Sequence, residues 1–500
     1  MNSSGMMLLS QAAQVLNGRL VGHDVRFAAV STDSRKIKAG DLFIALRGEH
    51  FDGYEFVATA VQSGAAAAMA NADSYEARPS LAHPESRIPN PDFPILIVED
   101  TRLALGQLAA YWREQFDIPL AAITGSNGKT TVKEMLTGIL RAAAGSDNAV
   151  LATQGNFNND IGMPLTLLQL NARHRYAVIE MGMNHPGEID YLTHIARPDV
   201  ALITNASGAH LAGLGSVLAV AHAKGEIFAG LKHQGIAVIN ADDDHAPLWR
   251  TLAGSHPLLE FGLGGMTRCA QADVTGGWQP QGAGLQLDAH TPSGDFSADL
   301  QVPGAHNARN ALAATAAAIA LNVPLEVIAM GLERFVGVAG RLQRKAARHG
   351  AVLIDDTYNA NPASMRAAIG VLAEAKGKRV MVMGDMGELG DDAVMLHAGI
   401  GTEARSAGIE KFLALGALSV NAVRSFGCGA EHFERIEDLQ KALEEELDED
   451  TTVLVKGSRF MKMERVVQYL ESGELEVGSG KPASRSPLST PHLPKEKKCC

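Results

Sequence analysis

One short segment constrains this chain more than any other, the run Ala121–Thr131 with the sequence AAITGSNGKTT. Its apolar start is typical of a buried strand, and a turn bracketed by Gly125 and Gly128 follows. A helical pattern then runs over Val132–Leu140. Backbone N–H groups in such a turn point inward at an anion, and the start of the helix adds partial positive charge. The segment therefore predicts a strand–loop–helix unit that cradles phosphates.

The loop also carries the side chains that a nucleoside triphosphate needs. Lys129 offers a full charge to the β- and γ-phosphates, and the Thr130 hydroxyl suits a magnesium ion. The usual pattern G-x-x-x-x-G-K-[ST] would have glycine where this chain has Ile123, so an ordinary strand-to-helix turn with a solvated lysine is the alternative. The expected ATP-binding loop comprises Thr124, Gly125, Ser126, Asn127, Gly128, Lys129, Thr130 and Thr131.

Length and composition set the broad class. A chain of 500 residues is too long for one core, and about three domains are expected. With 46% apolar and 20% charged residues it is typical of a globular protein. A net charge of −12 argues against nucleic-acid binding. No secretory signal, spanning helix or disulfide framework is evident, so we expect a cytoplasmic protein without membrane insertion.

The order of strand and helix patterns predicts an α/β protein of three domains. We expect a small N-terminal α/β substrate domain over 1–99 and a central ATP-binding domain with a mostly parallel sheet over 100–338. A doubly wound, Rossmann-like domain over 339–472 and a polar, disordered tail over 473–500 should follow. Gly-rich alternating patterns over 269–302 predict an antiparallel patch within the central domain.

Polar residues follow several of the expected parallel strands, where ligands bind in such sheets. Glu180 ends one strand, His210 follows the next, and Lys224 lies in the helical segment after it. Taken singly, Glu180 could be a surface charge, His210 a capping or core residue and Lys224 a solvated helix lysine. Together with the phosphate loop, the carboxylate points to a magnesium site.

Two further groups lie beyond the antiparallel patch. Asn307 and Asn310 share one face of a helix start, where amides could contact a nucleobase or simply cap the helix. Asp356 and Tyr358 follow a strand of the last domain and could hold a ribose and base, although a plain turn is the alternative. Polar strand ends in two domains suggest a ligand cleft between them.

In these motifs the chain resembles the Mur ligases, ATP-dependent enzymes that build the peptide of the cell-wall precursor. The resemblance covers about residues 25–470 in motif order. It rests on the segments Asp33–Arg35, Gly40–Phe43, Gly155–Pro164, Glu180–Glu188, Asp356–Met365 and Gly384–Gly390. Within the family, the Asn-rich loop and the Met183–Glu188 run resemble the member that joins D-alanyl-D-alanine to UDP-N-acetylmuramoyl-tripeptide. The Asp-Asn-Pro-Arg motif of the diamino-acid-adding member is absent.

The resemblance implies roles for particular residues. Magnesium would bind Thr130 and Glu180, and a second ion would bind His210 and be bridged by Lys224 carrying a carbamate. Catalysis would then depend on Lys129, Glu180, His210 and Lys224. The set that faces adenosine and phosphate would be Asn307, Asn310, Arg341, Asp356 and Tyr358. The set that contacts the UDP-peptide or the dipeptide would be Ser34, Arg35, Asn156, Asn158, Asn159, His397, Lys456, Ser458 and Arg459.

Two other functions stay open at this stage. A ligase of the same mechanism, such as a folylpolyglutamate synthase, would share the motifs of the central domain. A regulatory nucleotide switch belongs to another class, although the Asn-Lys-x-Asp motif of GTPases is absent. We expect a monomer, and the sequence leaves open whether lysine or diaminopimelate is the third residue of the acceptor tripeptide.

Overall fold

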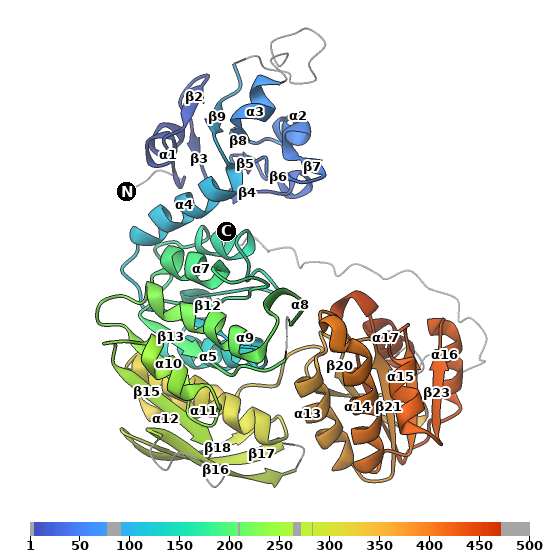
Figure 1. Cartoon of the computed structure of the whole chain (residues 1–500). Helices are drawn as coiled ribbons and strands as arrows, with labels where there is room; N and C mark the ends of the chain where they lie inside the picture. The colour runs from blue at the N-terminus through green and yellow to red at the C-terminus, as the bar shows by residue number, and fades with distance from the viewer. Residues whose placement is uncertain (1–4, 78–91, 209–210, 264–271, 283, 472–500) are drawn as a thin grey trace, which may run out of the picture.

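The structure is a computed structural model that describes residues 5–77, 92–208, 211–263, 272–282 and 284–471. They form three α/β bodies that follow one another along the chain (Figure 1). This confirms the expected class and architecture. Within the described ranges, no helix combines the length and apolar character needed to cross a bilayer. The tail predicted to be disordered, 473–500, lies outside the described residues.

The N-terminal body is built on a five-stranded sheet in the order β2-β9-β8-β5-β4, parallel except for β2. Its strands are β2 Arg19–Val21, β4 Val30–Ser31, β5 Leu42–Ile44, β8 Ala67–Asn71 and β9 Ile95–Val98. Two short pairs flank it: β1 Met7–Leu8 with β3 Arg26–Phe27, and β6 Arg47–Gly48 with β7 Phe51–Asp52. The helices are α1 Leu9–Val15, α2 Val57–Gln62 and α3 Ala72–Glu76.

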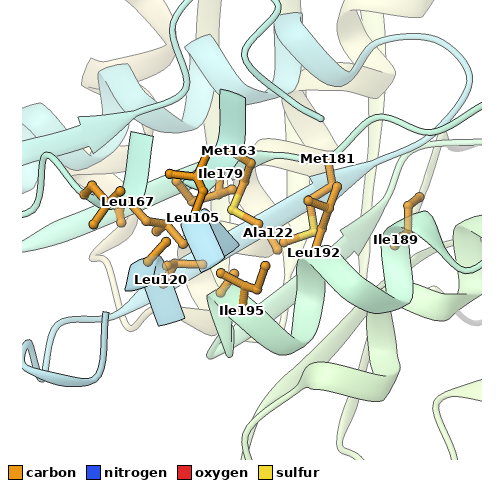
Figure 2. Packing of buried hydrophobic residues seen from close by; sticks show 14 of the residues in the cluster. Leu105, Leu120, Ala122, Met163, Leu167, Ile179, Met181, Ile189, Leu192 and Ile195 are labelled. Carbon is orange, nitrogen blue, oxygen red and sulfur yellow. The ribbon is translucent and has the colours of Figure 1, made fainter. Parts of the chain in front are cut away.

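Helix α4 (Thr101–Glu114) joins the first body to the second. Asp100 caps it by accepting the N–H of Arg102 at 2.7 Å and of Leu103 at 3.0 Å. The buried face of α4 lies in one continuous core with Val98 of the first sheet and Ile179 of the second, and Figure 2 shows Leu105 of α4 and Ile179 among the side chains of this core. The predicted boundary at 99/100 thus falls just before a helix that both bodies share.

The middle body has a nine-stranded sheet in the order β11-β12-β10-β13-β14-β15-β16-β17-β18. The sheet is parallel from β11 to β16 and antiparallel beyond. Its strands are β10 Leu120–Thr124, β11 Val150–Ala152, β12 Tyr176–Glu180, β13 Val200–Ile203, β14 Ile236–Asn240, β15 Leu258–Leu263, β16 Val274–Gln281, β17 Gly284–Thr291 and β18 Gly294–Leu300. The antiparallel patch predicted over 269–302 therefore extends the main sheet.

Apolar residues alternate between the two faces of this sheet. Ala122 and Ile203 face the side of α4, α6, α7 and α9, while Ile123 and Leu202 face α5, α11 and α12. The helices are α5 Lys129–Ala144, α6 Gly162–Leu167, α7 Glu188–Ala196, α8 Leu211–Leu214, α9 Val217–Gly225, α10 Ala246–Leu252, α11 Ala305–Ala320 and α12 Leu325–Glu333. Because helices cover both faces of the sheet, ligands can approach it at the carboxyl ends of its parallel strands.

The C-terminal body has six strands in the order β19-β20-β24-β21-β22-β23, parallel except for β19. They are β19 Gln343–Ala346, β20 Val352–Asp356, β21 Lys378–Gly384, β22 Lys411–Leu415, β23 Ala430–Phe433 and β24 Thr451–Lys456. Helices α13 Pro362–Ala373, α14 Ala393–Ser406 and α15 Val420–Phe426 cover one face, and α16 Ile436–Glu444 and α17 Glu464–Glu471 cover the other. This is the doubly wound sheet that the sequence predicts.

Candidate functional site

A cavity of about 1110 Å³ lies between the middle and C-terminal bodies. Its walls come from the segments that follow β10, β12, β13 and β14 on one side and β20, β21 and β24 on the other, together with the start of α11. The carboxyl ends of two parallel sheets thus face one space, which is where α/β proteins bind ligands. The cleft predicted between two domains is present.

The phosphate loop forms one wall of this cavity. Gly125 has φ +144° and Gly128 has φ +82°, backbone conformations that favour glycine. A Cβ at Gly125 would lie 1.8 Å from Thr204 Oγ1, and a Cβ at Gly128 would lie 2.5 Å from Asn310 Oδ1. Lys129 Nζ donates to the carbonyl of Gly125 at 2.5 Å. The loop is therefore tightly packed, and the side chain of Lys129 folds back to contact the backbone of the turn.

The threonines of the loop have different surroundings. Thr124 is buried and donates its hydroxyl to Met181 O at 2.9 Å, away from the cavity wall. The hydroxyl of Thr130 accepts from the guanidinium of Arg341 at 3.2 Å, and that guanidinium lies 4.1 Å from the ring centroid of Tyr358. Residues of the middle and C-terminal bodies therefore meet at the phosphate loop. The binding of ATP by Arg341 and Tyr358 stays a prediction.

Glu180 ends β12 beside this loop, because β12 pairs in parallel with β10 and Glu180 is level with Ile123. Its carboxylate accepts from Asn158 Nδ2 at 2.9 Å through Oε1. The other oxygen, Oε2, is buried and has no hydrogen-bond partner among the described residues. A buried carboxylate oxygen without a donor suits a hard cation, so the residues present fit a magnesium ion. No group of three or more His, Cys, Asp or Glu side chains with metal-site geometry occurs in the described part of the chain.

Lys224 is near enough to Glu180 to feel its charge but does not line the cavity. Its side chain is fully buried in α9, and Nζ has no hydrogen-bond partner among the residues that the structure describes. Burial, reinforced by the charge of Lys129, holds the pKa of Lys224 well below its ordinary value. His210, the expected partner of Lys224 in a metal site, lies outside the described residues.

The C-terminal wall is organised by a buried ion pair. Lys456 Nζ lies 2.6 Å from Asp356 Oδ2 and also donates to Asn359 O at 2.9 Å. Burial raises the pKa of Asp356 above its ordinary value even with Lys456 beside it. Ser458 accepts the N–H of Gly387 at 2.8 Å, which ties the segment after β24 to the segment after β21.

Most of the predicted site residues come together in this cavity. The ones that line it are Ser126, Asn127, Gly128, Lys129, Thr131, Asn158, Asn159, Glu180, Asn307, Asn310, Arg341, Asp356, Tyr358, Lys456, Ser458 and Arg459. Asn156 is exposed on the same loop as Asn158 and is not part of the lining. Asn307 donates to Pro303 O at 2.8 Å, so it also fastens the first turn of α11.

His397 is placed differently from the prediction that it contacts the dipeptide. Its side chain is fully buried in α14 and does not line the cavity. Nδ1 lies 2.7 Å from Ala393 O, and Nε2 accepts the N–H of Met386 at 2.9 Å. Burial lowers the pKa of His397, and one neutral tautomer satisfies both contacts. The geometry makes His397 a support for the loop after β21.

Ser34 and Arg35, expected near the uridine diphosphate, lie in a short 3-10 turn of the N-terminal body. Neither lines the cavity. The Arg35 guanidinium is exposed and lies 2.9 Å from Asp33 Oδ1, and this hydrogen bond lowers the pKa of Asp33 to about 2. Their contact with a nucleotide stays a prediction.

Sequence reasoning missed several residues of the wall. Asp242 and Asp243 follow β14, and Arg309 of α11 lies 3.3 Å from Asp242 Oδ2. Polar residues at the end of a parallel strand were the available signal, since the same signal identified Glu180. Arg102 and Asp160 form an ion pair in the wall, and they belong to segments far apart in the chain that no sequence spacing links.

Three family models cover the bodies in order: "Mur ligase family, catalytic domain" over 26–113, "Mur ligase middle domain" over 123–318, and "Mur ligase, glutamate ligase domain" over 340–459. A curated relative from Escherichia coli, the UDP-N-acetylmuramoyl-tripeptide–D-alanyl-D-alanine ligase, is 42% identical over 93% of this chain and 98% of its own length. The chain belongs to the Mur ligase family.

Solved Mur ligases share the architecture. A structure from Acinetobacter baumannii has a TM-score of 0.79 and 36% identity over 94% of this chain and 100% of that one. It is called UDP-N-acetylmuramoylalanyl-D-glutamyl-2,6-diaminopimelate–D-alanyl-D-alanyl ligase. The MurF ligase from Thermotoga maritima, in complex with ADP, has a TM-score of 0.74 and 26% identity over 89% of this chain and 97% of that one.

Proposed function

We propose that this Mur ligase uses ATP to join D-alanyl-D-alanine to UDP-N-acetylmuramoyl-tripeptide, giving the UDP-linked pentapeptide that peptidoglycan synthesis consumes. The observation that carries the proposal is the shared cavity: the phosphate loop around Lys129 and the Asn158–Asn159 loop line the same space. The nucleotide named for the T. maritima ligase and the substrates named for the E. coli ligase support it. The identity to that E. coli ligase also favours this function over a folate ligase or a switch.

The chemistry follows from the poor reactivity of a carboxylate. Transfer of the γ-phosphoryl group of ATP to the terminal carboxylate of the tripeptide gives an acyl phosphate, which has a good leaving group. The charge of Lys129 stabilises the phosphoryl oxygens during transfer. The amine of the dipeptide then attacks the carbonyl carbon, and inorganic phosphate departs. No side-chain nucleophile is needed, because phosphoryl transfer activates the carboxylate and the amine of the dipeptide attacks it directly.

Magnesium would be held by Thr130 and Glu180, where it would neutralise charge on the phosphates of ATP.

We further propose a second ion at His210, with Lys224 carrying a carbamate. The buried amine of Lys224 supports this, since its lowered pKa favours the neutral form that reacts with CO₂. A Lys224→Ala variant should lose nearly all activity and regain part of it with small carboxylates. Full activity without rescue would remove Lys224 from the site.

The domain roles belong to the same proposal. Residues 1–99 would hold the UDP end, 100–338 would bind ATP, and 339–472 would close over the cavity. The contacts of Arg341 with Thr130 and of Asn361 with Asn127 support the last assignment. We further expect a cytoplasmic monomer.

A product assay tests the function. The protein is incubated with ATP, magnesium, UDP-N-acetylmuramoyl-tripeptide and D-alanyl-D-alanine, and the masses of the products are measured by mass spectrometry. A UDP-peptide heavier by one dipeptide is the expected result. Glutamate added to a folate in a parallel incubation, with the UDP-peptide unchanged, would contradict the proposal.

A further inference from the structure

The cavity wall carries an ion pair that the proposed chemistry does not use. Arg102 Nε contacts Asp160 Oδ2, and both residues line the cavity. The Arg102 side chain is 56% exposed and that of Asp160 is 21% exposed, so part of each charge faces the open space. The wall therefore offers a cation and an anion side by side.

The pair lies near the reacting end of the cavity. Asp160 is two residues beyond Asn158, whose amide donates to Glu180 Oε1 at 2.9 Å. Two residues of chain span at most about 7 Å between Cα atoms. Glu180 in turn lies beside the phosphate loop, where the carboxylate of the acceptor must meet the γ-phosphate. Asp160 therefore lies on the same loop as the residue that contacts Glu180, and both line one cavity.

We propose that Arg102 and Asp160 recognise a second amino-acid group on the third residue of the acceptor peptide, as in a diaminopimelate. The Arg102 guanidinium would bind the carboxylate of that group, and the Asp160 carboxylate would bind its ammonium. This inference rests on the proposed function and selects one acceptor among those it allows. Three methylene groups separate the two amino-acid centres of diaminopimelate, so the second centre extends about 5 Å beyond the first, along the wall that carries the pair.

The surroundings of Arg102 favour this reading. The side-chain hydrogen bond to Asp160 raises the pKa of Arg102, so it stays charged. The other nearby carboxylates are already engaged: Asp100 accepts two N–H groups at the start of α4, and Glu188 accepts the N–H of Asn184 at 2.6 Å. A planar guanidinium can bind a carboxylate through two parallel hydrogen bonds. A lysine in the acceptor would leave that capacity of Arg102 unused.

Steady-state kinetics with two acceptors test the inference. The purified full chain is assayed with UDP-tripeptides that end in diaminopimelate or in lysine. We expect wild-type kcat/KM to favour diaminopimelate by at least about tenfold, the size of one charge-assisted contact. Arg102→Gln should bring the ratio of the two values toward one, and Arg102→Lys should restore part of it.

Arg366→Gln is the matched control, because it breaks an ion pair of similar exposure with Glu403 outside the cavity wall and should leave the ratio unchanged. A wild-type ratio near one, or an Arg102→Gln variant that lowers both kcat/KM values equally, would overturn the inference alone. Failure of the wild-type protein to extend either tripeptide would instead overturn the proposed function, and the inference with it.

Discussion

At the scale of single residues, buried lysines organise the site. Lys133 of α5 is 1% exposed, and its Nζ donates to Thr153 O at 2.8 Å. The hydroxyl of Thr153 in turn accepts the N–H of Glu180 at 2.9 Å. Lys133 thus supports the backbone that presents Glu180. The sequence could not predict this, because a lysine within an amphipathic helix is normally on the solvated face.

Replacing Lys129 tests the phosphate loop directly. Lys129→Ala should lower ATP-dependent turnover by about 10³-fold, since it removes a charge aimed at the transferring phosphoryl group. The folded structure should persist, as followed by circular dichroism on heating. Turnover within tenfold of wild type would contradict the role assigned to Lys129.

Replacing Lys133 tests its supporting role. Lys133→Met should lower the free energy of unfolding by about 1–3 kcal/mol, because the carbonyl of Thr153 loses its donor in a buried position. Urea denaturation measures this. Lys441→Met on the exposed face of α16 is the control and should change stability by less than about 0.5 kcal/mol. Equal stability of the two variants would show that the Lys133 contact is not stabilising.

At the scale of elements, the sequence predicted the strands that are buried on both faces. The predicted strand Ala351–Asp355 differs from β20 by one residue at each end, and Lys411–Leu415 coincides with β22, since runs of apolar residues mark such strands. The edge strand β19, Gln343–Ala346, was missed because its sequence is mostly polar and its pairing depends on β20. Edge strands lack the apolar pattern that identifies central ones.

A side chain at Gly128 should destabilise the phosphate loop. Gly128→Ala combines φ +82° with a Cβ 2.5 Å from Asn310 Oδ1, so we expect a loss of about 1–2 kcal/mol of stability and a higher KM for ATP. Calorimetry and ATP titrations measure the two effects. Gly370→Ala within α13, where a Cβ meets no atom within 4 Å, should instead be neutral or stabilising. The same response from both variants would contradict the strained geometry.

At the scale of the whole molecule, the arrangement of the bodies creates the site. Asn361 Nδ2 donates to Asn127 Oδ1 at 2.9 Å across the cavity, and Arg341 reaches Thr130. Each pair joins residues more than two hundred positions apart. Sequence patterns identified both walls, because each wall is a set of strand ends. They could not show which residues of the two walls touch, since that depends on the packing of entire domains.

The pKa of His306 reports on this arrangement. Burial, together with the charges of Arg309 and Lys456, lowers the pKa of His306 to about 4. The unfolded chain would bind a proton near pH 6.5, so this group reduces stability as the pH falls from about 6.5 and the loss is complete below about 4. An NMR titration, with His306→Gln for assignment, measures the value. A pKa near 6.5 would show that the ring is solvated and the two bodies stand apart in solution.

The most direct test of the central claim is the release of phosphate from ATP in the presence of magnesium, measured with each of the two other substrates alone and with both. UDP-N-acetylmuramoyl-tripeptide and D-alanyl-D-alanine together should be required for sustained release, because the acyl phosphate is consumed only when the amine attacks it. Equal release with neither of these two substrates present would contradict the ligase account and indicate a nucleotide hydrolase.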